Sequence, residues 1–325
     1  MFNYVPIYLL AFAISFGVCV PVCKRLIPTL KKKAAQPIYE GGPFWHSAKS
    51  GTPTLGGASF VISVLLAALL SCSILFMTGS TKVALSVISV VGFGLLCSLV
   101  GLIDDLTKLK RKHNAGLTPM QKLVLQTVFS AAFLFVRHGV LCYPTDVIIL
   151  DKSIDLGLLY YPAAIFVLLG IVNCANLTDG IDGLAASVSL AIGVCLFLIS
   201  AYSYQDSAII SAMLCGGALG FLVFNVNPAK IFMGDTGSLF LGAQAAGVVF
   251  CLGNPFLSIL FGGVYVIEGF SVVLQVLSYK TRRKRIFIMS PIHHHLEKIG
   301  WNESKICLVA VIVTLVLSIP AFLLI

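Results

Sequence analysis

Hydrophobic positions fill this chain in long continuous runs, and polar positions gather in the short stretches between them. A helix needs roughly 20 apolar residues to cross the hydrocarbon core of a bilayer, and the runs are close to that length. The pattern therefore predicts a series of membrane-spanning helices. We expect ten of them, at residues 3–28, 53–77, 83–103, 119–137, 157–172, 184–201, 207–224, 237–252, 255–279 and 304–325.

The composition supports this interpretation. Hydrophobic residues make up 58% of the chain and charged residues 11%, and the mean hydropathy is +1.00, whereas soluble domains carry roughly 25% charge. The first run is too long for a removed signal peptide, so it is expected to stay as a span. No linker or change of composition divides the chain. We predict one domain over residues 1–325, an all-α polytopic integral membrane protein with ten transmembrane helices.

The distribution of charge predicts the orientation, because basic residues mark the cytoplasmic side of a membrane protein. Of the 22 basic residues, all but Lys82, Arg137 and Lys152 lie in or beside the odd-numbered loops. Both termini are then outside and the odd loops are cytoplasmic. On the outer side, residues 138–156 are expected to form a small hairpin, and Asp206 is expected on the solvated surface.

Acidic residues on the cytoplasmic side occur in short motifs near span ends, the first being GLIDDLTKLKRK. Asp104 and Asp105 are expected at the end of the third span, and a solvated helix end with Lys108 paired to both would be the simplest explanation. Carboxylates at a helix C-terminus face the negative end of the helix dipole, at a cost of roughly 0.3–1 kcal/mol each. A bound divalent cation such as Mg²⁺, or a role in proton transfer, would explain the pair.

The second motif, NCANLTDGIDGLAAS, spaces Asn173, Asn176, Asp179 and Asp182 three residues apart. Either aspartate can be explained as the N-cap of the sixth span. Four amide and acid side chains between glycines exceed what a cap requires. Such a cluster can bind hydroxyl groups, the edge of a base or the water shell of a metal.

Two further motifs suggest contacts with phosphate. In FNVNPAKIFMGDTGSLFLG, Asp235 and Thr236 precede the eighth span, where capping is compatible with the attraction of a helix N-terminus for phosphate. In HSAKSGTPTLGG, Lys49 is a candidate phosphate contact beside a glycine-rich segment. Pro53 is expected in the first turn of the second span.

Glu268 lies inside the ninth apolar run, where an ionisable side chain is by default a functional hypothesis. Gly262 and Gly263 precede it, and a helix broken at these glycines would bring the carboxylate to a polar cavity.

The stretch MSPIHHHLEK contains three of the six histidines, His293, His294 and His295. Metal-binding histidines on a helix are spaced i and i+4, so this triplet does not have the metal pattern. It predicts an irregular loop that offers several hydrogen-bonding groups to a large polar ligand. At least one ring is expected to hold the loop, through Glu297 or the backbone.

Acids, amides and lysines on one face of a lipid-embedded bundle suit a polar cytoplasmic substrate that meets a lipid substrate. Carboxylates with lysines nearby are typical of Mg²⁺-assisted phosphoryl transfer. The chain has no Walker motif, GxSxG or HExxH, so ATP hydrolysis, serine hydrolysis and zinc proteolysis have no support. A transporter with an acidic vestibule is the alternative from another class, although transporters usually carry polar residues at the midplane of both halves.

Five segments in order, GTPTLGG, GLIDD, NxxNLTDGIDGL, FNxxPAxxFMGDTGSL and RIFIMSPIHHHLE, resemble the bacterial phospho-N-acetylmuramoyl-pentapeptide-transferases. These belong to the polyprenyl-phosphate N-acetylhexosamine-1-phosphate transferases. The resemblance implies transfer of phospho-N-acetylmuramoyl-pentapeptide from its UDP carrier to undecaprenyl phosphate, which releases UMP and makes lipid I. A sibling that transfers GlcNAc-1-phosphate is the nearest alternative within this class.

The resemblance also implies roles, residue by residue. Asp104, Asp105 and Asp235 are the expected catalytic acids, with Asp235 a Mg²⁺ ligand. Expected substrate contacts are Lys49, Lys108, Asn173, Asn176, Asp179, Asp182, Asn225, Phe232, Glu268, His293, His294 and His295. Of the histidines, His294 or His295 is expected to reach the substrate. Direct attack by the lipid phosphate and a two-step route through an aspartyl phosphate both remain open.

The expected partners follow from this chemistry. They are UDP-MurNAc-pentapeptide, undecaprenyl phosphate and the lipid bilayer, with no nucleic acid and with a homodimer left open. The expected place is the inner membrane of a bacterium, with the active site facing the cytoplasm.

Overall fold

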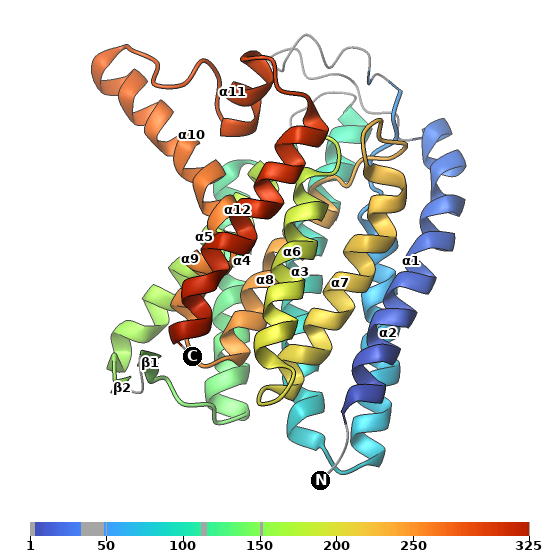
Figure 1. The fold of residues 1–325 in the computed structure, drawn as a ribbon, viewed down its shortest axis with the longest axis vertical. Helices are drawn as coiled ribbons and strands as arrows, with labels where there is room; N and C mark the ends of the chain where they lie inside the picture. The colour runs from blue at the N-terminus through green and yellow to red at the C-terminus, as the bar shows by residue number, and fades with distance from the viewer. Residues whose placement is uncertain (1–3, 34–48, 50, 112–115, 150–151, 325) are drawn as a thin grey trace.

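The computed structural model describes residues 4–33, 49, 51–111, 116–149 and 152–324. It is a bundle of long helices with one small hairpin (Figure 1). The elements are α1 (Val5–Lys33), α2 (Ala58–Met77), α3 (Thr81–Arg111), α4 (Pro119–Leu134), η2 (Phe135–Val140), β1 (Val147–Ile149), β2 (Lys152–Ile154), η3 (Gly157–Leu159), α5 (Tyr160–Thr178), α6 (Leu184–Ser200), α7 (Gln205–Asn225), α8 (Asp235–Cys251), η4 (Pro255–Leu257), α9 (Ser258–Phe261), α10 (Gly263–Arg282), α11 (Ile292–Lys298) and α12 (Glu303–Leu324).

Helices occupy every one of the ten predicted ranges. Within the described part of the chain, seven are long and apolar enough to cross a membrane. The segment Pro255–Phe261 and helix α10, bent by 83° where they meet, can form an eighth crossing. The other two helices, α6 and α8, have 17 residues each. The chain is therefore an all-α polytopic membrane protein, and the predicted break at Gly262 and Gly263 is confirmed.

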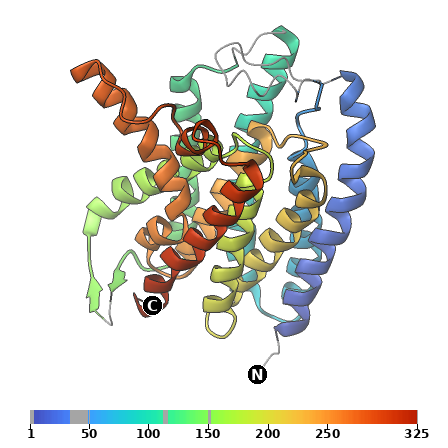
Figure 2. The same cartoon turned by 45° about the horizontal axis from the view of Figure 1, so that its top comes forward.

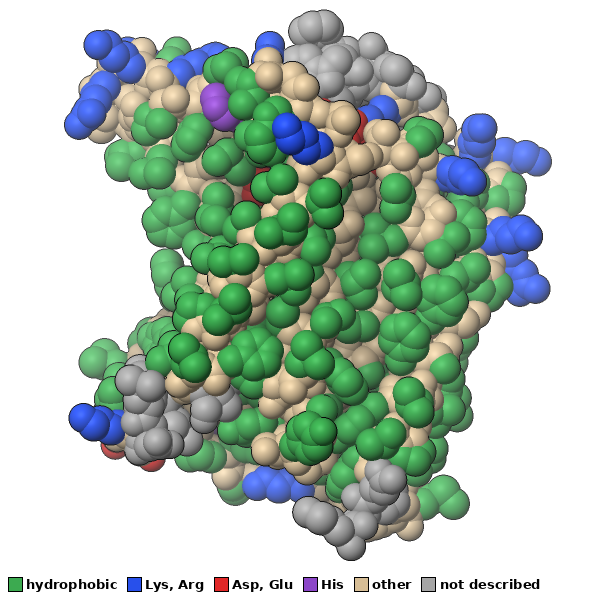
Figure 3. Space-filling view, viewed as in Figure 1, with side chains coloured by type: hydrophobic (Ala, Val, Ile, Leu, Met, Phe, Trp, Pro, Cys, Tyr) green, Lys and Arg blue, Asp and Glu red, His purple; other side chains and the backbone are tan. Residues whose placement is uncertain are grey.

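The distribution of side chains on the surface agrees with a membrane setting. Hydrophobic side chains cover the middle of the face shown in Figure 3, and lysines and arginines lie toward its two ends. Both chain termini lie at one end of the bundle and α11 lies at the other (Figure 1). The far end of α10 projects away from the remaining helices in both orientations (Figure 1 and Figure 2).

The interior of the bundle is formed chiefly by α7 and α8. In α8 every side chain from Thr236 to Cys251 is buried, and this helix packs against α3 and α5. Helix α1 packs on α7 and α2, and α12 packs on α6. Helix α8 is rich in Gly and Ala, and small residues let backbones approach closely where lipid gives no hydrophobic drive for association.

The second span begins later than the sequence predicts, so the expectation for Pro53 is wrong. Helix α2 starts at Ala58. Before it, the backbone pairs with a distant segment: the Pro53 carbonyl accepts a hydrogen bond from Phe232 N at 2.8 Å, and Gly56 N donates to Phe232 O at 2.9 Å. These bonds hold the segment extended, and the helix starts only after them.

The third span is longer than predicted. Helix α3 has 31 residues and is roughly 46 Å long at 1.5 Å per residue, more than the ~30 Å of the hydrocarbon core. Asp104 and Asp105 therefore lie inside the helix, more than a turn before its end at Arg111. The unfavourable placement against the helix dipole that their expected position implied does not apply.

The predicted hairpin is confirmed by the antiparallel pair β1–β2. The expectation that Asp206 is solvated is wrong, because Asp206 is buried and accepts hydrogen bonds from Ser86 and from the Tyr143 hydroxyl. Arg137, from η2, is also buried; it donates to Ser86 at 3.0 Å and stacks 4.2 Å from the centre of the Tyr143 ring. This network joins η2, α3 and α7.

Candidate active site

Three carboxylates from two helices meet where α3 packs against the start of α8. Asp104 and Asp105 come from α3 and Asp235 is the first residue of α8, and one oxygen from each lies within 4.8 Å of the others. Gly101 permits this approach, because a Cβ there would lie 2.2 Å from the carbonyl oxygen of Asp235. The acids that the sequence singles out are thus brought together by close contact between two backbones.

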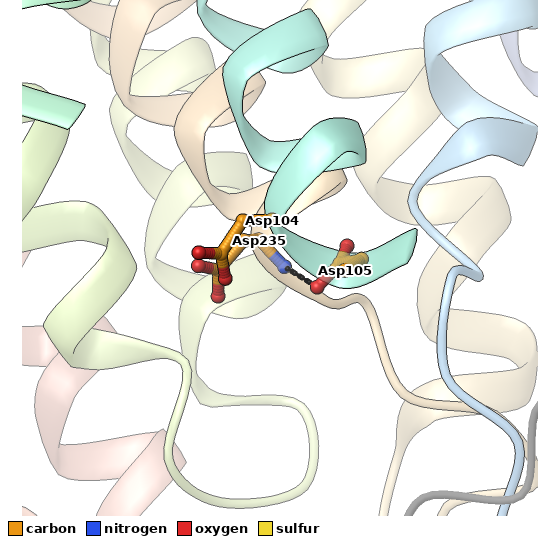
Figure 4. A group of neighbouring side chains, drawn as sticks. All are labelled: Asp104, Asp105 and Asp235. Atoms are coloured by element: carbon orange, nitrogen blue, oxygen red, sulfur yellow. Dashed lines mark hydrogen bonds between the residues drawn. The ribbon is translucent and has the colours of Figure 1, made fainter. Parts of the chain in front are cut away.

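Asp105 differs from the other two carboxylates in its direction. Asp104 and Asp235 lie side by side, whereas Asp105 is turned toward the backbone at the start of α8 (Figure 4). It accepts hydrogen bonds from Asp235 N at 3.1 Å, Thr236 N at 2.9 Å and the Thr236 hydroxyl at 2.7 Å. Helix α8 has no side-chain cap of its own at Gly234. The carboxylate that satisfies its free N–H groups comes from another helix, so the capping explanation for Asp235 is wrong.

Two lysines lie against Asp104 and Asp235. Lys122 Nζ is 2.5 Å from Asp235 Oδ2 and 3.1 Å from Asp104 Oδ1. Lys108 Nζ is 2.6 Å from Asp104 Oδ2, as its i+4 spacing predicts, and 3.4 Å from Asp235 Oδ2. Lys122 was missed as a site residue: its place in the first turns of α4 carries no motif, and the sequence showed only that its charge lies on the same side as the acids.

The two lysines determine the ionisation of Asp235. Burial acts to raise the pKa of this carboxyl, but the positive charges of Lys108 and Lys122 outweigh burial and hold the pKa below its usual range. Asp235 is therefore an anion. Carboxylate oxygens are what Mg²⁺ selects, so Asp235 with Asp104 fits a divalent cation.

The asparagine–aspartate motif is divided between two places. Asn176 donates to Asp235 Oδ1 at 3.1 Å and to the Ser238 hydroxyl at 2.7 Å. Asn173 instead donates to Gln126 Oε1 at 2.7 Å, inside the bundle. Only Asn176 of these two amides contacts the carboxylate group.

Asp179 lies near enough to the other acids to be affected by their charges. Burial and the negative charges of Asp235, Asp105 and Asp182 together raise the pKa of Asp179 to about 8. Without a bound cation, burial and the neighbouring negative charges favour the protonated form of this carboxyl. A cation nearby would favour the ionised form.

A second cluster forms around Asp182. Lys49 Nζ is 2.7 Å from Asp182 Oδ1 and 2.7 Å from Glu303 Oε1, and Glu303 Oε2 accepts from Asp182 N at 2.8 Å. The N-cap of α6 is Gly183 with no side-chain cap, so capping by Asp182 or Asp179 is wrong. Glu303 was missed, since one acid in the first turn of a helix has an ordinary structural explanation.

Asn225 and Phe232 make hydrogen bonds within the segments next to Asp182 and Asp235. Asn225 Oδ1 accepts from Gly183 N at 3.1 Å, and its amide donates to Ile231 O at 2.9 Å. Asn225 is buried, and the Phe232 backbone pairs with Pro53. In this structure both residues brace the loops that carry Asp182 and Asp235.

The histidine triplet lies on the short helix α11, so the prediction of an irregular loop is wrong. His293 is buried and its Nδ1 is 3.1 Å from Glu268 Oε2. His294 Nδ1 is 2.7 Å from Glu297 Oε2, which confirms that one ring is held by Glu297. His295 Nδ1 accepts from Ile288 N at 3.3 Å.

Comparisons with known proteins agree with this arrangement. Residues 87–253 match the family described as glycosyl transferase family 4. A phospho-N-acetylmuramoyl-pentapeptide-transferase of Halalkalibacterium halodurans is 44% identical over 303 residues, 92% of each chain. One from Clostridium perfringens is 41% identical over 321 residues, 98% of this chain and 96% of the relative. One from Caldicellulosiruptor bescii is 40% identical over 315 residues, 96% of each. With its cluster of aspartates between α3 and α8, this chain belongs to glycosyl transferase family 4 and, within it, to the family of the phospho-N-acetylmuramoyl-pentapeptide-transferases.

Proposed function

We propose that this protein transfers phospho-N-acetylmuramoyl-pentapeptide from UDP-MurNAc-pentapeptide to undecaprenyl phosphate, giving lipid I and UMP. The observation that carries the proposal is the group in which Lys108 and Lys122 each contact both Asp104 and Asp235. The amide of Asn176 donates a hydrogen bond to Asp235. Enzymes of phosphoryl transfer use such groups, because catalysis of this reaction is mainly positioning and neutralisation of charge. The names of the relatives support the muramoyl substrate over UDP-GlcNAc.

The residues have distinct proposed roles. Asp235 would hold Mg²⁺, which when bound would neutralise charge on the diphosphate. Lys108 and Lys122 would bind phosphate oxygens. Asn176 orients Asp235 through the hydrogen bond to its Oδ1. Lys49, Asp179 and Asp182 are proposed to contact the nucleotide or diphosphate, with Asn173, Asn225 and Phe232 at its edge.

The reaction forms one P–O bond and breaks another. An oxygen of the lipid phosphate attacks the phosphorus bonded to the sugar, and the bond from that phosphorus to UMP breaks. Any proton on the lipid phosphate passes to a carboxylate. We assign this role to Asp104, because Asp105 is already bonded to the start of α8. If the attack instead comes from an aspartate, a phosphorylated protein would form before the lipid reacts.

The membrane arrangement is part of the proposal. Ten crossings would place both termini outside and the carboxylate cluster at the cytoplasmic face of a bacterial inner membrane. The support is the gathering of basic residues in alternate loops, together with the lengths of α3 and the other long helices. A homodimer stays a prediction.

The proposal is tested by release of UMP. Purified protein in detergent with undecaprenyl phosphate and UDP-MurNAc-pentapeptide is expected to release UMP with Mg²⁺ and to stop when EDTA removes it. UDP-GlcNAc in place of the muramoyl substrate is expected to give no release. Release from UDP-GlcNAc alone would identify the sibling activity, and no release from either nucleotide sugar would contradict the transferase proposal. D235N is expected to lose activity at every Mg²⁺ concentration.

A further inference from the structure

A buried carboxylate holds the start of the histidine helix at two points. Glu268 in α10 is 3% exposed, and its Oε2 accepts a hydrogen bond from His293 N at 3.3 Å and lies 3.1 Å from His293 Nδ1. One oxygen thus binds both the backbone and the ring of the same residue. Because both contacts are made by the same residue, they fix the direction of the ring and turn its other nitrogen, Nε2, away from Glu268.

The other ring nitrogen, Nε2, faces the backbone at Gly180, in the segment that joins Asp179 to Asp182. His293 is 0% exposed, and its Nε2 has no hydrogen-bond partner among the described residues. A Cβ added to Gly180 would lie 2.2 Å from this nitrogen. The ring therefore occupies the space that any side chain at Gly180 would need. Gly180 lies between Asp179 and the residues that lead to Asp182, so the ring touches the loop that carries both aspartates.

The neighbouring histidine depends on this contact. The ring centres of His293 and His294 are 4.1 Å apart in an edge-to-face arrangement. His294 is only partly buried, and the ring of His295 packs 5.8 Å from that of Phe287. Because α11 has only seven residues, its position depends on such side-chain contacts more than on its own helical hydrogen bonds.

We propose that Glu268 and His293 form a joint that docks α11 on the loop of Asp179 and Asp182, and that both are positioning residues. Glu268 orients His293, and the oriented ring fixes α11 so that His294 and His295 are presented to the nucleotide sugar. A carboxylate within an apolar span needs a partner that offsets its desolvation, and His293 supplies two hydrogen bonds. The inference rests on the proposed function for its activity readout, and a second readout does not need it.

Matched substitutions at Glu268 test the positioning role. E268Q keeps an acceptor for both hydrogen bonds, whereas E268L removes it. E268Q is expected to stay within roughly fivefold of the wild type in kcat/KM, and E268L and H293L are expected to lose roughly tenfold or more. H293N can still donate to Glu268 but lacks the ring that packs on Gly180, so its activity is expected to lie between those of the wild type and H293L. If E268L is as active as E268Q, Glu268 does not position His293 and the proposal is wrong.

A double mutant tests whether Glu268 acts through His293. In the H293L background, E268L is expected to cost less than about twofold more, because two residues that form one contact are not additive. A full additive loss would show that Glu268 acts independently and would overturn the proposal.

Hydrogen exchange tests the joint without any substrate. Backbone amides of residues 292–298 are expected to exchange faster in E268L than in the wild type, and at the wild-type rate in E268Q. Unchanged exchange in E268L would contradict the joint even if activity fell. If wild-type protein released no UMP, the proposed function would fail while this measurement would still decide the joint. Should E268L not fold, G180A replaces it, since its methyl group meets Nε2 and is expected to release α11 in the same way.

Discussion

Lys122 is the residue that most changes the interpretation of the site at the scale of single side chains. It contacts two of the three clustered carboxylates and lowers the pKa of Asp235. Motif spacing singled out Lys108, which follows the acids on the same helix, and gave no sign of Lys122, which reaches them from α4. A partner on another helix is visible only when the helices are packed.

Replacement of Lys122 by methionine is expected to reduce kcat/KM by roughly tenfold or more, because a cation is removed from the place where phosphate charge must be neutralised. K122R, which keeps the charge, is expected to retain more activity than K122M. The exposed Lys152, at the opposite end of the bundle, supplies the control K152M, for which no change is expected. UMP release at varied substrate concentrations measures all three, and equal activity of K122M and K152M would contradict the role.

Asp105 is the second residue whose role becomes clear only from its contacts. The sequence paired it with Asp104 as a catalytic acid, and the structure places it as the cap of α8. Its catalytic role stays a prediction, whereas its structural role follows from three hydrogen bonds.

D105A is expected to destabilise the protein by roughly 1–3 kcal/mol, because buried N–H groups at the start of α8 lose their acceptor. D105N keeps one acceptor oxygen and is expected to be destabilised less. Thermal unfolding in detergent without Mg²⁺ measures this apart from activity. Equal midpoints for the wild type and both variants would show that the cap contributes nothing.

At the scale of elements, the site depends on how closely α3 and α8 approach. Hydropathy located both helices, but it ended α3 at residue 103 because the polar residues that follow lower the local average. The structure continues the helix to Arg111, because a helix need not end where the apolar run ends. The contact of Gly101 with the backbone of Asp235 brings the acids together.

G101A is expected to reduce activity strongly and to lower the thermal midpoint, because its methyl group would lie 2.2 Å from a backbone oxygen that cannot rotate away. The same helix offers a matched control, since a Cβ at Gly92 would meet nothing within 4 Å. G92A is expected to match or exceed the wild type in stability, because alanine favours the helix by about 1 kcal/mol over glycine. Similar losses in both variants would mean that helix propensity, not the contact, is responsible.

At the scale of the whole molecule, the two ends of the bundle differ in the elements that they carry. The termini share one end and α11 lies at the other (Figure 1). The hairpin β1–β2 belongs to the loop predicted to be outside, and so does Cys142, the exposed member of the ten cysteines.

Orientation in the membrane can be tested at this cysteine without engineering. A membrane-impermeant maleimide is expected to label Cys142 in intact spheroplasts, because this residue is exposed on the predicted outer side. C142S is expected to abolish that labelling. Labelling of Cys142 only after the membrane is opened would reverse the proposed orientation and move the carboxylate cluster to the outer face.

The sequence by itself determined the class of fold, the approximate place of every long helix, the hairpin and the aspartates of the site. These follow from local properties: a bilayer requires long apolar runs, and a cluster of acids at a membrane boundary needs a chemical reason. Only the tertiary structure decided which acid caps α8, that Lys122 and Glu303 join the site, and that Glu268 binds His293. Those pairs join residues 18 to 254 positions apart, and no local pattern encodes which helix faces will meet.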